Sequence, residues 1–481
     1  MLKIKHASAE DFSTIMIDPK LRSFLEKHFS TLPAFLHALL PNQVARFWES
    51  VQARSLPEWE RLIQVLSPSS NRNLDTLSWE EPLCWSIERL SQKGLSPSSL
   101  QRIGEAAFQN GEVAFLTVAG GLGTRLGFLG PKGLVPVTPL QQKTLFQVFA
   151  EKLQALQKRY HHPFHWLIMT SLQTDAATRK AFQEHHWYDP HYLHFFQQGT
   201  LPAFSTENAL LVDENGQIAE FPDGHGGVFQ ALQKAQLLPF LQQEGIRTLS
   251  YFQVDNPLVH LDDALFLGVH LQQASDFSTK VVEKICTEEQ VGLFAQINQQ
   301  LQLVEYSEFP PAYVSARNSK GTLRYRWGNT AIHLLSMDFV QTCAKQPLPY
   351  HVCRKKVSAW DPALQNKQVM EGHKIEQFIF DVLPQARHPL LWEVQREEEF
   401  SPVKNATGTD TLLTCQNDQI QRWLRWLKKT DPSWFASQNN PLLPAFEISP
   451  LFADNETDFF HAWKCLAQKP HSLQGWYAHE S

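Results

Sequence analysis

The sequence has few cysteines, no excess of positive charge and no long apolar run, and each absence argues against a class of protein. Its six cysteines are scattered through 481 residues, and none belongs to a CxxC pair. This pattern is typical of free thiols in a reducing compartment rather than of a disulfide framework. The 43 basic and 49 acidic residues give a net charge of −6, which argues against non-specific binding to nucleic acid.

No apolar run approaches the roughly 20 residues that a membrane helix needs. The first residues, Met1 to His6, show no apolar signal region. We therefore expect a cytoplasmic protein that works without a membrane. Hydrophobic residues make up 43% of the chain, which is enough for well-buried interiors. A chain of this length exceeds the size at which one core stops growing, so more than one domain is expected.

Short apolar segments alternate with helical patterns in the middle of the chain. Residues 113–119, 166–170 and 249–254 are almost continuously apolar, as is typical of strands covered on both faces of a parallel sheet. Leu145, Phe146, Phe149 and Leu153 have helical spacing between the first two. The alternation predicts an α/β fold. Ligands of such sheets bind beyond the carboxyl ends of the strands, where Gly120 and Asp255 follow predicted strands.

The strongest local motif is a glycine-rich segment, Gly120-Gly121-Leu122-Gly123-Thr124-Arg125, followed by Lys132. Glycines let backbone N–H groups approach phosphate oxygens, and arginine and lysine add positive charge. The segment fits neither the GxGxxG dinucleotide fingerprint nor the GxxxxGK[ST] phosphate loop. A nicotinamide dehydrogenase is therefore disfavoured. A turn from strand to helix without a ligand is the simplest alternative.

The string GGLGTRLGFLGPKG resembles the nucleotide loop of the UDP-sugar pyrophosphorylase family, and within it the eukaryotic-type UDP-N-acetylglucosamine branch. Further strings similar to that branch follow in order along the chain, from about residue 115 to residue 451. They include residues 195–203, 222–227, 254–256, 281–284, 304–308, 328–329, 400–406 and 447–451. So many matches in sequence make the resemblance specific, although residues 1–105 match only in helical character.

The resemblance implies a Rossmann-like, doubly wound mixed sheet of the nucleotide-sugar transferase type. An N-terminal, mostly helical domain would span residues 1–105, the catalytic nucleotidyltransferase domain 106–406, and a small C-terminal domain 407–481. The implied enzyme is a uridylyltransferase that forms UDP-N-acetylglucosamine and pyrophosphate from UTP and N-acetylglucosamine 1-phosphate. The implied cofactor is Mg²⁺. The sequence does not indicate an oligomeric state.

The resemblance also assigns roles to single residues. Arg125, Lys132 and Lys404 are the implied catalytic residues, with Lys404 on the sugar phosphate, and Asp255 is the implied metal ligand. The implied UTP contacts are Gly120, Gly121, Gly123, Thr124, Gln198, Gly224 and Lys374. The implied sugar contacts are His225, Gly292, Glu305, Tyr306 and Asn329.

Two positions depart from the N-acetylglucosamine branch. Leu122 stands where that branch usually has Gln, and His225 stands where it usually has Asn. Both residues are more like the UDP-glucose and broad UDP-sugar branches. The sugar therefore stays open, with glucose or galactose 1-phosphate as the alternative to the N-acetyl sugar. A nucleotide-binding regulator that has lost catalysis is a further alternative, because a fold alone does not fix a function.

Overall fold

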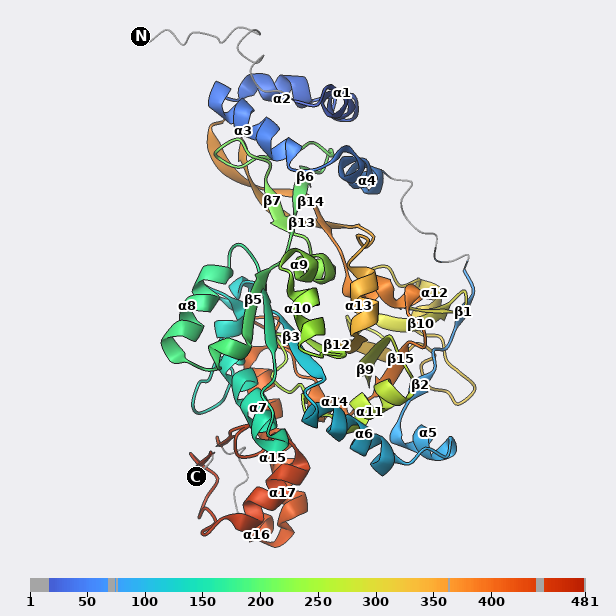
Figure 1. The fold of residues 1–481 in the computed structure, drawn as a ribbon, viewed down its shortest axis with the longest axis vertical. Coiled ribbons are helices and arrows are strands. Elements are labelled where there is room, and N and C mark those ends of the chain that lie inside the picture. Colours follow the sequence, from blue (N-terminus) through green and yellow to red (C-terminus); the bar gives the residue numbers. More distant parts are fainter. Residues whose placement is uncertain (1–16, 68–73, 75–76, 362–363, 438–444, 480–481) are drawn as a thin grey trace. The chain divides into compact units, whose positions relative to one another are not determined.

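The structure is a computed structural model that describes residues 17–67, 74, 77–361, 364–437 and 445–479 (Figure 1). The chain forms two compact units that interleave along the sequence. The first unit comprises Met1–Leu74, Gly199–Gly227 and Leu348–Asp381, and the second comprises Asp75–Gln198, Val228–Pro347 and Val382–Ser481. Each unit has its own hydrophobic core.

The second unit is built on a large mixed sheet with the strand order β2-β15-β9-β12-β8-β3-β4-β5. The strands in this path are β2 Cys84–Trp85, β3 Val113–Val118, β4 Trp166–Thr170, β5 Leu193–Gln197, β8 Thr248–Gln253, β9 Phe277–Glu283, β12 Trp327–Ser336 and β15 Leu390–Glu393. The strands β1 Trp79–Glu80, β10 Leu293–Ile297 and β11 Gln300–Val304 branch from this path, because β10 pairs with β12 as well as with β1 and β11.

Strand direction decides which chain segments meet at one edge of this sheet. β8, β3, β4 and β5 are parallel neighbours, so their carboxyl ends lie at the same edge. β9 and β15 are also parallel to each other. β12 lies between β8 and β9 and is antiparallel to both. β3, β4 and β8 are almost wholly buried, as their continuous apolar sequences predict.

Helices of the second unit pack against the sheet or against one another, and α6 and α11 lie side by side (Figure 1). They are α5 Ile87–Gln92, α6 Pro97–Gln109, α7 Leu145–Tyr160, α8 Asp175–His185, α9 Val228–Lys234, α10 Leu237–Gln243, α11 Ala264–Gln272, α12 Pro311–Val314, α13 Met337–Cys343, α14 Arg396–Glu399, α15 Leu412–Thr430, α16 Pro432–Ser437 and α17 Glu456–Cys465. The short strands β16 Glu447–Ile448 and β17 Tyr477–Ala478 pair in parallel near the end of the chain.

The first unit combines helices with a four-stranded sheet of order β13-β14-β6-β7. Its helices are α1 Pro19–His28, α2 Leu32–Ala38, α3 Pro41–Gln52 and α4 Leu56–Leu66. Its strands are β6 Thr200–Ser205, β7 Glu220–Pro222, β13 His351–Asp361 and β14 Asn366–Glu376. Buried side chains such as Phe47, Trp59 and Phe204 form one core between these helices and the sheet.

Buried polar contacts join the C-terminal segment to the rest of the second unit. The Glu447 carboxylate accepts the N–H groups of Leu140 and Gln141, at 2.9 and 2.8 Å. Asp454 pairs with the Lys152 ammonium at 2.5 Å, and Lys152 is 3% exposed. Charged groups are costly to bury unless they are paired, so these contacts tie the segment firmly to α7 and the residues before it.

The expected mixed α/β sheet is confirmed, and so are the three predicted strands. The expected parallel neighbours are present, while β12 adds antiparallel pairing that the sequence pattern did not reveal. The division into domains at residues 1–105, 106–406 and 407–481 stays a prediction. None of the described helices combines the length and the apolar character needed to span a bilayer.

Candidate active site

The glycine-rich segment forms a compact loop directly after β3. The N–H of Gly123 donates to the Gly130 carbonyl at 2.9 Å, and the N–H of Lys132 donates to the Gly121 carbonyl at 3.0 Å. These bonds fold the segment back on itself, and Thr124 and Arg125 lie exposed on the 3-10 helix Thr124–Leu126. The loop therefore presents backbone N–H groups and a guanidinium at the carboxyl edge of the sheet.

Gln198 lies against this loop, although 78 positions separate it from Gly120 in the sequence. β3, β4 and β5 are parallel neighbours, and Gln198 directly follows β5, its N–H donating to the Thr170 carbonyl at 2.9 Å. A Cβ atom at Gly120 would lie 2.0 Å from the Gln198 side-chain oxygen. A side chain at position 120 would therefore displace the Gln198 amide, and the loop and the amide share one site.

Lys132, Asp255 and Lys404 lie close together beyond the ends of β3 and β8. The Lys132 ammonium is 3.1 Å from the Asp255 carboxylate, which is buried. The Val403 N–H donates to the Asp255 carbonyl at 2.9 Å, so the loop segment that carries Lys404, the next residue, lies beside Asp255. Burial alone would raise the pKa of Asp255, but the charges of Lys132 and Lys404 outweigh it and hold that pKa below its usual range. The carboxylate is thus ionised at neutral pH.

The side chain of Asn256 connects the two segments that carry Asp255 and Lys404. Its Nδ2 donates to the Glu399 carbonyl at 2.7 Å, while its Oδ1 accepts from the N–H groups of Leu258 and Ser401, at 3.2 and 3.1 Å. Asn256 is 3% exposed. The sequence places Asn256 in a string similar to the family but does not indicate its role, because an Asn after a strand is also common in ordinary turns.

The expected sugar contacts of the second unit also come together. The Asn329 N–H donates to the Gly292 carbonyl at 3.0 Å, and a Cβ atom on Gly292 would lie 3.3 Å from a Glu305 carboxylate oxygen. Tyr306 follows Glu305 and is 48% exposed. Glu305 and Asn329 therefore lie beside one glycine, and a carboxylate and an amide are suited to the hydroxyl groups of a sugar.

Gly224, His225 and Lys374 belong to the first unit. Gly224 has a left-handed φ of 86°, and its neighbour His225 accepts a hydrogen bond at Nδ1 from the Ile379 N–H at 3.1 Å. Burial lowers the pKa of His225 to about 4, so its ring is neutral at pH 7 and the proton resides on Nε2. Lys374 lies on β14 with its ammonium 3.8 Å from the centroid of the Phe221 ring.

Asp223, next to Gly224, carries a buried carboxyl group, and no cation among the described residues forms an ion pair with it. The residue is 6% exposed, and burial raises the pKa of this carboxyl to about 7. Hydrogen bonds with the backbone N–H groups of Asp223 and Gly199 lower that pKa, but burial outweighs them. Its Oδ1 atom has no hydrogen-bond partner among the described residues. A carboxyl in this position exchanges its proton near neutral pH.

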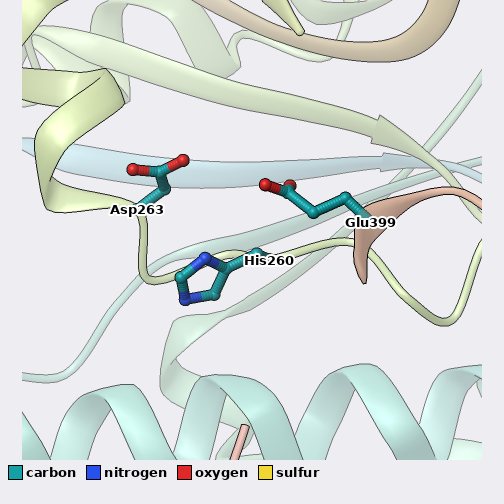
Figure 2. Close-up of side chains that lie close together, drawn as sticks. All are labelled: His260, Asp263 and Glu399. Atoms are coloured by element: carbon teal, nitrogen blue, oxygen red, sulfur yellow. The ribbon is translucent and has the colours of Figure 1, made fainter. Parts of the chain in front are cut away.

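A cluster away from the glycine-rich loop, formed by His260, Asp263 and Glu399, has the residue types of a metal site (Figure 2). The ammonium of Lys280 already neutralises it, at 2.7 Å from Asp263 and 2.6 Å from Glu399. Lys280 is 1% exposed, and burial lowers the pKa of His260 to about 4. The cluster is therefore a buried ion-pair network, and its geometry does not call for a metal.

Comparison with known proteins identifies the relatives of this chain. A model of the family described as UTP–glucose-1-phosphate uridylyltransferase matches residues 70–431. UDP-N-acetylglucosamine diphosphorylase 1 of Arabidopsis thaliana is 36% identical over 73% of this chain and 72% of its own length. UDP-N-acetylglucosamine pyrophosphorylase of Saccharomyces cerevisiae is 37% identical over 71% of this chain and 75% of its own length.

A solved structure shows the same fold. The uridine diphosphate N-acetylglucosamine pyrophosphorylase of Trypanosoma brucei, solved with an inhibitor, superposes with a TM-score of 0.73 at 24% identity. The alignment covers 98% of this chain and 97% of that chain. At this identity the likeness concerns the fold alone.

Proposed function

The chain belongs to the UTP–glucose-1-phosphate uridylyltransferase family and is a nucleotidyltransferase of the UDP-sugar pyrophosphorylase type, and on that basis we propose that it makes UDP-N-acetylglucosamine. Its substrates would be UTP and N-acetylglucosamine 1-phosphate, and pyrophosphate would be the second product. The names of relatives at 36% and 37% identity support this choice of sugar. The grouping of Lys132, Asp255 and Lys404 beyond the ends of β3 and β8 supports the chemistry.

In this reaction a phosphate oxygen of the sugar attacks the α-phosphorus of UTP. A new O–P bond forms, the bond from the α-phosphorus to the bridging oxygen breaks, and pyrophosphate leaves with that oxygen. Both reactants are anions and the attacking oxygen is already charged, so positioning and neutralisation are the main tasks. In the proposal, Arg125 and Lys132 hold the triphosphate and Lys404 holds the sugar phosphate.

We assign a divalent cation, Mg²⁺, to Asp255. The fit rests on an ionised, buried carboxylate beside a glycine-rich loop. Mg²⁺ is usually held by one or two carboxylates together with phosphate oxygens, so one protein carboxylate suffices. When bound, the ion would offset negative charge that develops on the phosphates. Asp255 must stay charged for this role, and the cations Lys132 and Lys404 keep it so.

The remaining site residues divide between nucleotide and sugar in the proposal. The nucleotide contacts would be Gly120, Gly121, Gly123, Thr124, Gln198, Gly224 and Lys374. The sugar contacts would be His225, Gly292, Glu305, Tyr306 and Asn329. The N-terminal helical domain and the small C-terminal domain would be accessory to the catalytic domain. A cytoplasmic location also belongs to the proposal.

His225 can accommodate an N-acetyl sugar, although a histidine at this position is more like the UDP-glucose and broad UDP-sugar branches. Because its Nδ1 accepts from Ile379 and its ring is neutral, Nε2–H is left as a donor. A donor suits the carbonyl oxygen of an acetamido group. His225→Asn keeps an acceptor for Ile379 and a donor in a smaller side chain, so we expect it to shift preference further toward the N-acetyl sugar. Leu122, which is 38% exposed, and the histidine at position 225 are the two features that favour glucose or galactose 1-phosphate instead.

The test is release of pyrophosphate from UTP with Mg²⁺ and a panel of sugar 1-phosphates. We expect the highest kcat/KM with N-acetylglucosamine 1-phosphate and a measurable rate with glucose 1-phosphate. If glucose 1-phosphate is better by about tenfold, a difference of about 1.4 kcal/mol, the choice of the N-acetyl sugar is wrong. If UTP binds and no sugar phosphate reacts, the chain is a nucleotide-binding regulator.

A further inference from the structure

The side chain of Asp223 contacts two glycines of the first unit that are distant in the sequence. A Cβ atom at Gly199 would lie 2.5 Å from the Asp223 Oδ2 atom, and a Cβ atom at Gly227 would lie 2.2 Å from the same oxygen. A side chain at either glycine would therefore push the carboxyl group away. The carboxyl group thus joins the residue that precedes β6 to the end of the turn that follows β7.

One oxygen of this carboxyl group holds a backbone segment in place. The N–H groups of Asp223 and Gly199 form hydrogen bonds with the carboxyl group, and Oδ1 has no partner among the described residues. Oδ2, the oxygen nearer to the glycines, is therefore the acceptor. The Gly199 N–H belongs to the peptide group that links it to Gln198, so this bond fixes the orientation of that peptide group.

The backbone of the same turn is also held by Gln377, which is 2% exposed. The Gln377 N–H donates to the Asp223 carbonyl at 2.7 Å, and the Gly226 N–H donates to the Gln377 carbonyl at 2.9 Å. A Cβ atom at Gly224 would lie 2.5 Å from that Gln377 carbonyl oxygen. The turn therefore has little freedom to change its conformation as long as Asp223 stays in place.

The groups next to these fixed segments are available to a ligand. Among the described residues, the Gly224 N–H has no acceptor and the side-chain amide of Gln198 has no hydrogen-bond partner. Neither group is charged. Such groups suit the carbonyl and N–H edge of a pyrimidine better than a phosphate, for which cations are the stronger partners.

We propose that Asp223 is a positioning residue for the nucleotide base: its carboxyl group fixes the peptide group after Gln198 and the turn at Gly224, and thereby sets a preference for uracil over cytosine. The inference rests on the proposed function for the identity of the nucleotide. The two bases have nearly the same shape and differ in which edge atoms donate and accept. A fixed turn leaves a polar group unpaired against the wrong base, whereas a loosened turn adapts to either base.

The acceptor oxygen, rather than the negative charge, carries this role. Burial raises the pKa of Asp223 to about 7, so both forms of the carboxyl group are present at neutral pH. Oδ2 accepts a hydrogen bond in either form when the proton resides on Oδ1. Asparagine offers the same acceptor in the same shape, and alanine offers none.

The experiment measures binding of uridine and cytidine 5′-monophosphates by calorimetric titration. We expect Asp223→Ala to raise the Kd for the uridine nucleotide roughly 10- to 100-fold and to reduce its preference over the cytidine nucleotide by about tenfold. Asp223→Asn should stay within about threefold of the parent on both measures. The Kd for tripolyphosphate, which has no base, should change by less than about twofold in every variant.

Asp213→Ala is the matched control, because Asp213 also holds a turn of the first unit. Its Oδ1 accepts the N–H groups of Asn215 and Gln217, each at 2.9 Å. This variant should lower the unfolding midpoint and leave the preference between the two nucleotides unchanged. If Asp223→Ala does not fold, Asp223→Ser takes its place, since the shorter hydroxyl does not reach the position of Oδ2.

Each outcome decides for or against the role of Asp223. An unchanged preference in folded Asp223→Ala would overturn it, and so would an equal loss of preference in Asp223→Asn or in Asp213→Ala. A parent that binds both nucleotides equally would also overturn it, while turnover with UTP would leave the proposed function standing. A preference that depends on Asp223 in a chain without any turnover would refute the proposed function and leave the role of Asp223 intact.

Discussion

Asn256→Ala should weaken both the fold and the reaction, because one side chain fastens the segments that carry Asp255 and Lys404. The substitution removes the bonds to the Glu399 carbonyl and to the N–H groups of Leu258 and Ser401. Each lost hydrogen bond lowers the unfolding free energy by about 1 kcal/mol, and each buried polar group that loses its partner lowers it further unless water reaches that group. We therefore expect a loss of about 3–5 kcal/mol of unfolding free energy.

Thermal unfolding followed by circular dichroism measures the first effect. For a unit of this size the loss corresponds to a midpoint lowered by roughly 5–10 °C. Asn256→Asp keeps the acceptor but turns a carboxylate oxygen toward the Glu399 carbonyl in place of the donor, so it should also lower the midpoint. Asn366→Ala, at an exposed position on β14, is the control and should leave the midpoint within about 1 °C.

A double-mutant cycle on kcat/KM measures the second effect. If Asn256 acts by holding Lys404 against Asp255, then Asn256→Ala should lower kcat/KM clearly in the parent. In the Lys404→Ala variant the same substitution should lower kcat/KM only slightly. Free energies of independent sites add, so full additivity would show that Asn256 supports only the fold. An unaltered midpoint together with unaltered kcat/KM would refute the reasoning altogether.

Three further changes test single groups. Lys404→Ala should raise the KM for the sugar phosphate by a factor that corresponds to roughly 1.5–3 kcal/mol and leave that for UTP nearly unchanged; equal losses for both substrates in steady-state kinetics would contradict its role. Asp255→Asn should keep the fold by circular dichroism and lose most turnover, because an amide is a poor ligand for a hard cation. Full activity of the parent in excess EDTA would contradict the metal role. Asp223, with a pKa raised from 3.8 to about 7, binds more protons when folded, so it favours folding at low pH and loses that contribution as pH rises from about 4 to 7. Asp223→Asn should therefore flatten the fall in unfolding midpoint across this window, and an identical pH profile would show that the carboxyl is not buried in its neutral form.

Elements defined by short-range patterns could be predicted from the sequence. β3, β4 and β8 appear as apolar runs because both faces of each strand are covered, and α7 appears through the spacing of its buried residues. The positions of Gly120 and Asp255 just beyond strand ends follow from the same pattern. Their sharing of one sheet edge follows from the parallel order of neighbouring strands.

Contacts that depend on distant pairing were beyond the sequence pattern. Nothing in the local sequence of β12 indicates that it lies antiparallel between β8 and β9. The hairpin of β13 and β14 alternates exposed and partly buried residues, so it lacks the continuous apolar run that revealed the central strands.

The contacts of Glu447 and Asp454 have a consequence for the gene as well as for the fold. A premature stop codon between Lys404 and Glu447 would leave the proposed catalytic residues intact and remove the partners of Leu140, Gln141 and Lys152. The truncated chain would then keep a buried ammonium with no carboxylate, a defect that costs several kcal/mol. Late nonsense mutations should therefore behave as loss-of-function alleles through degradation of the protein.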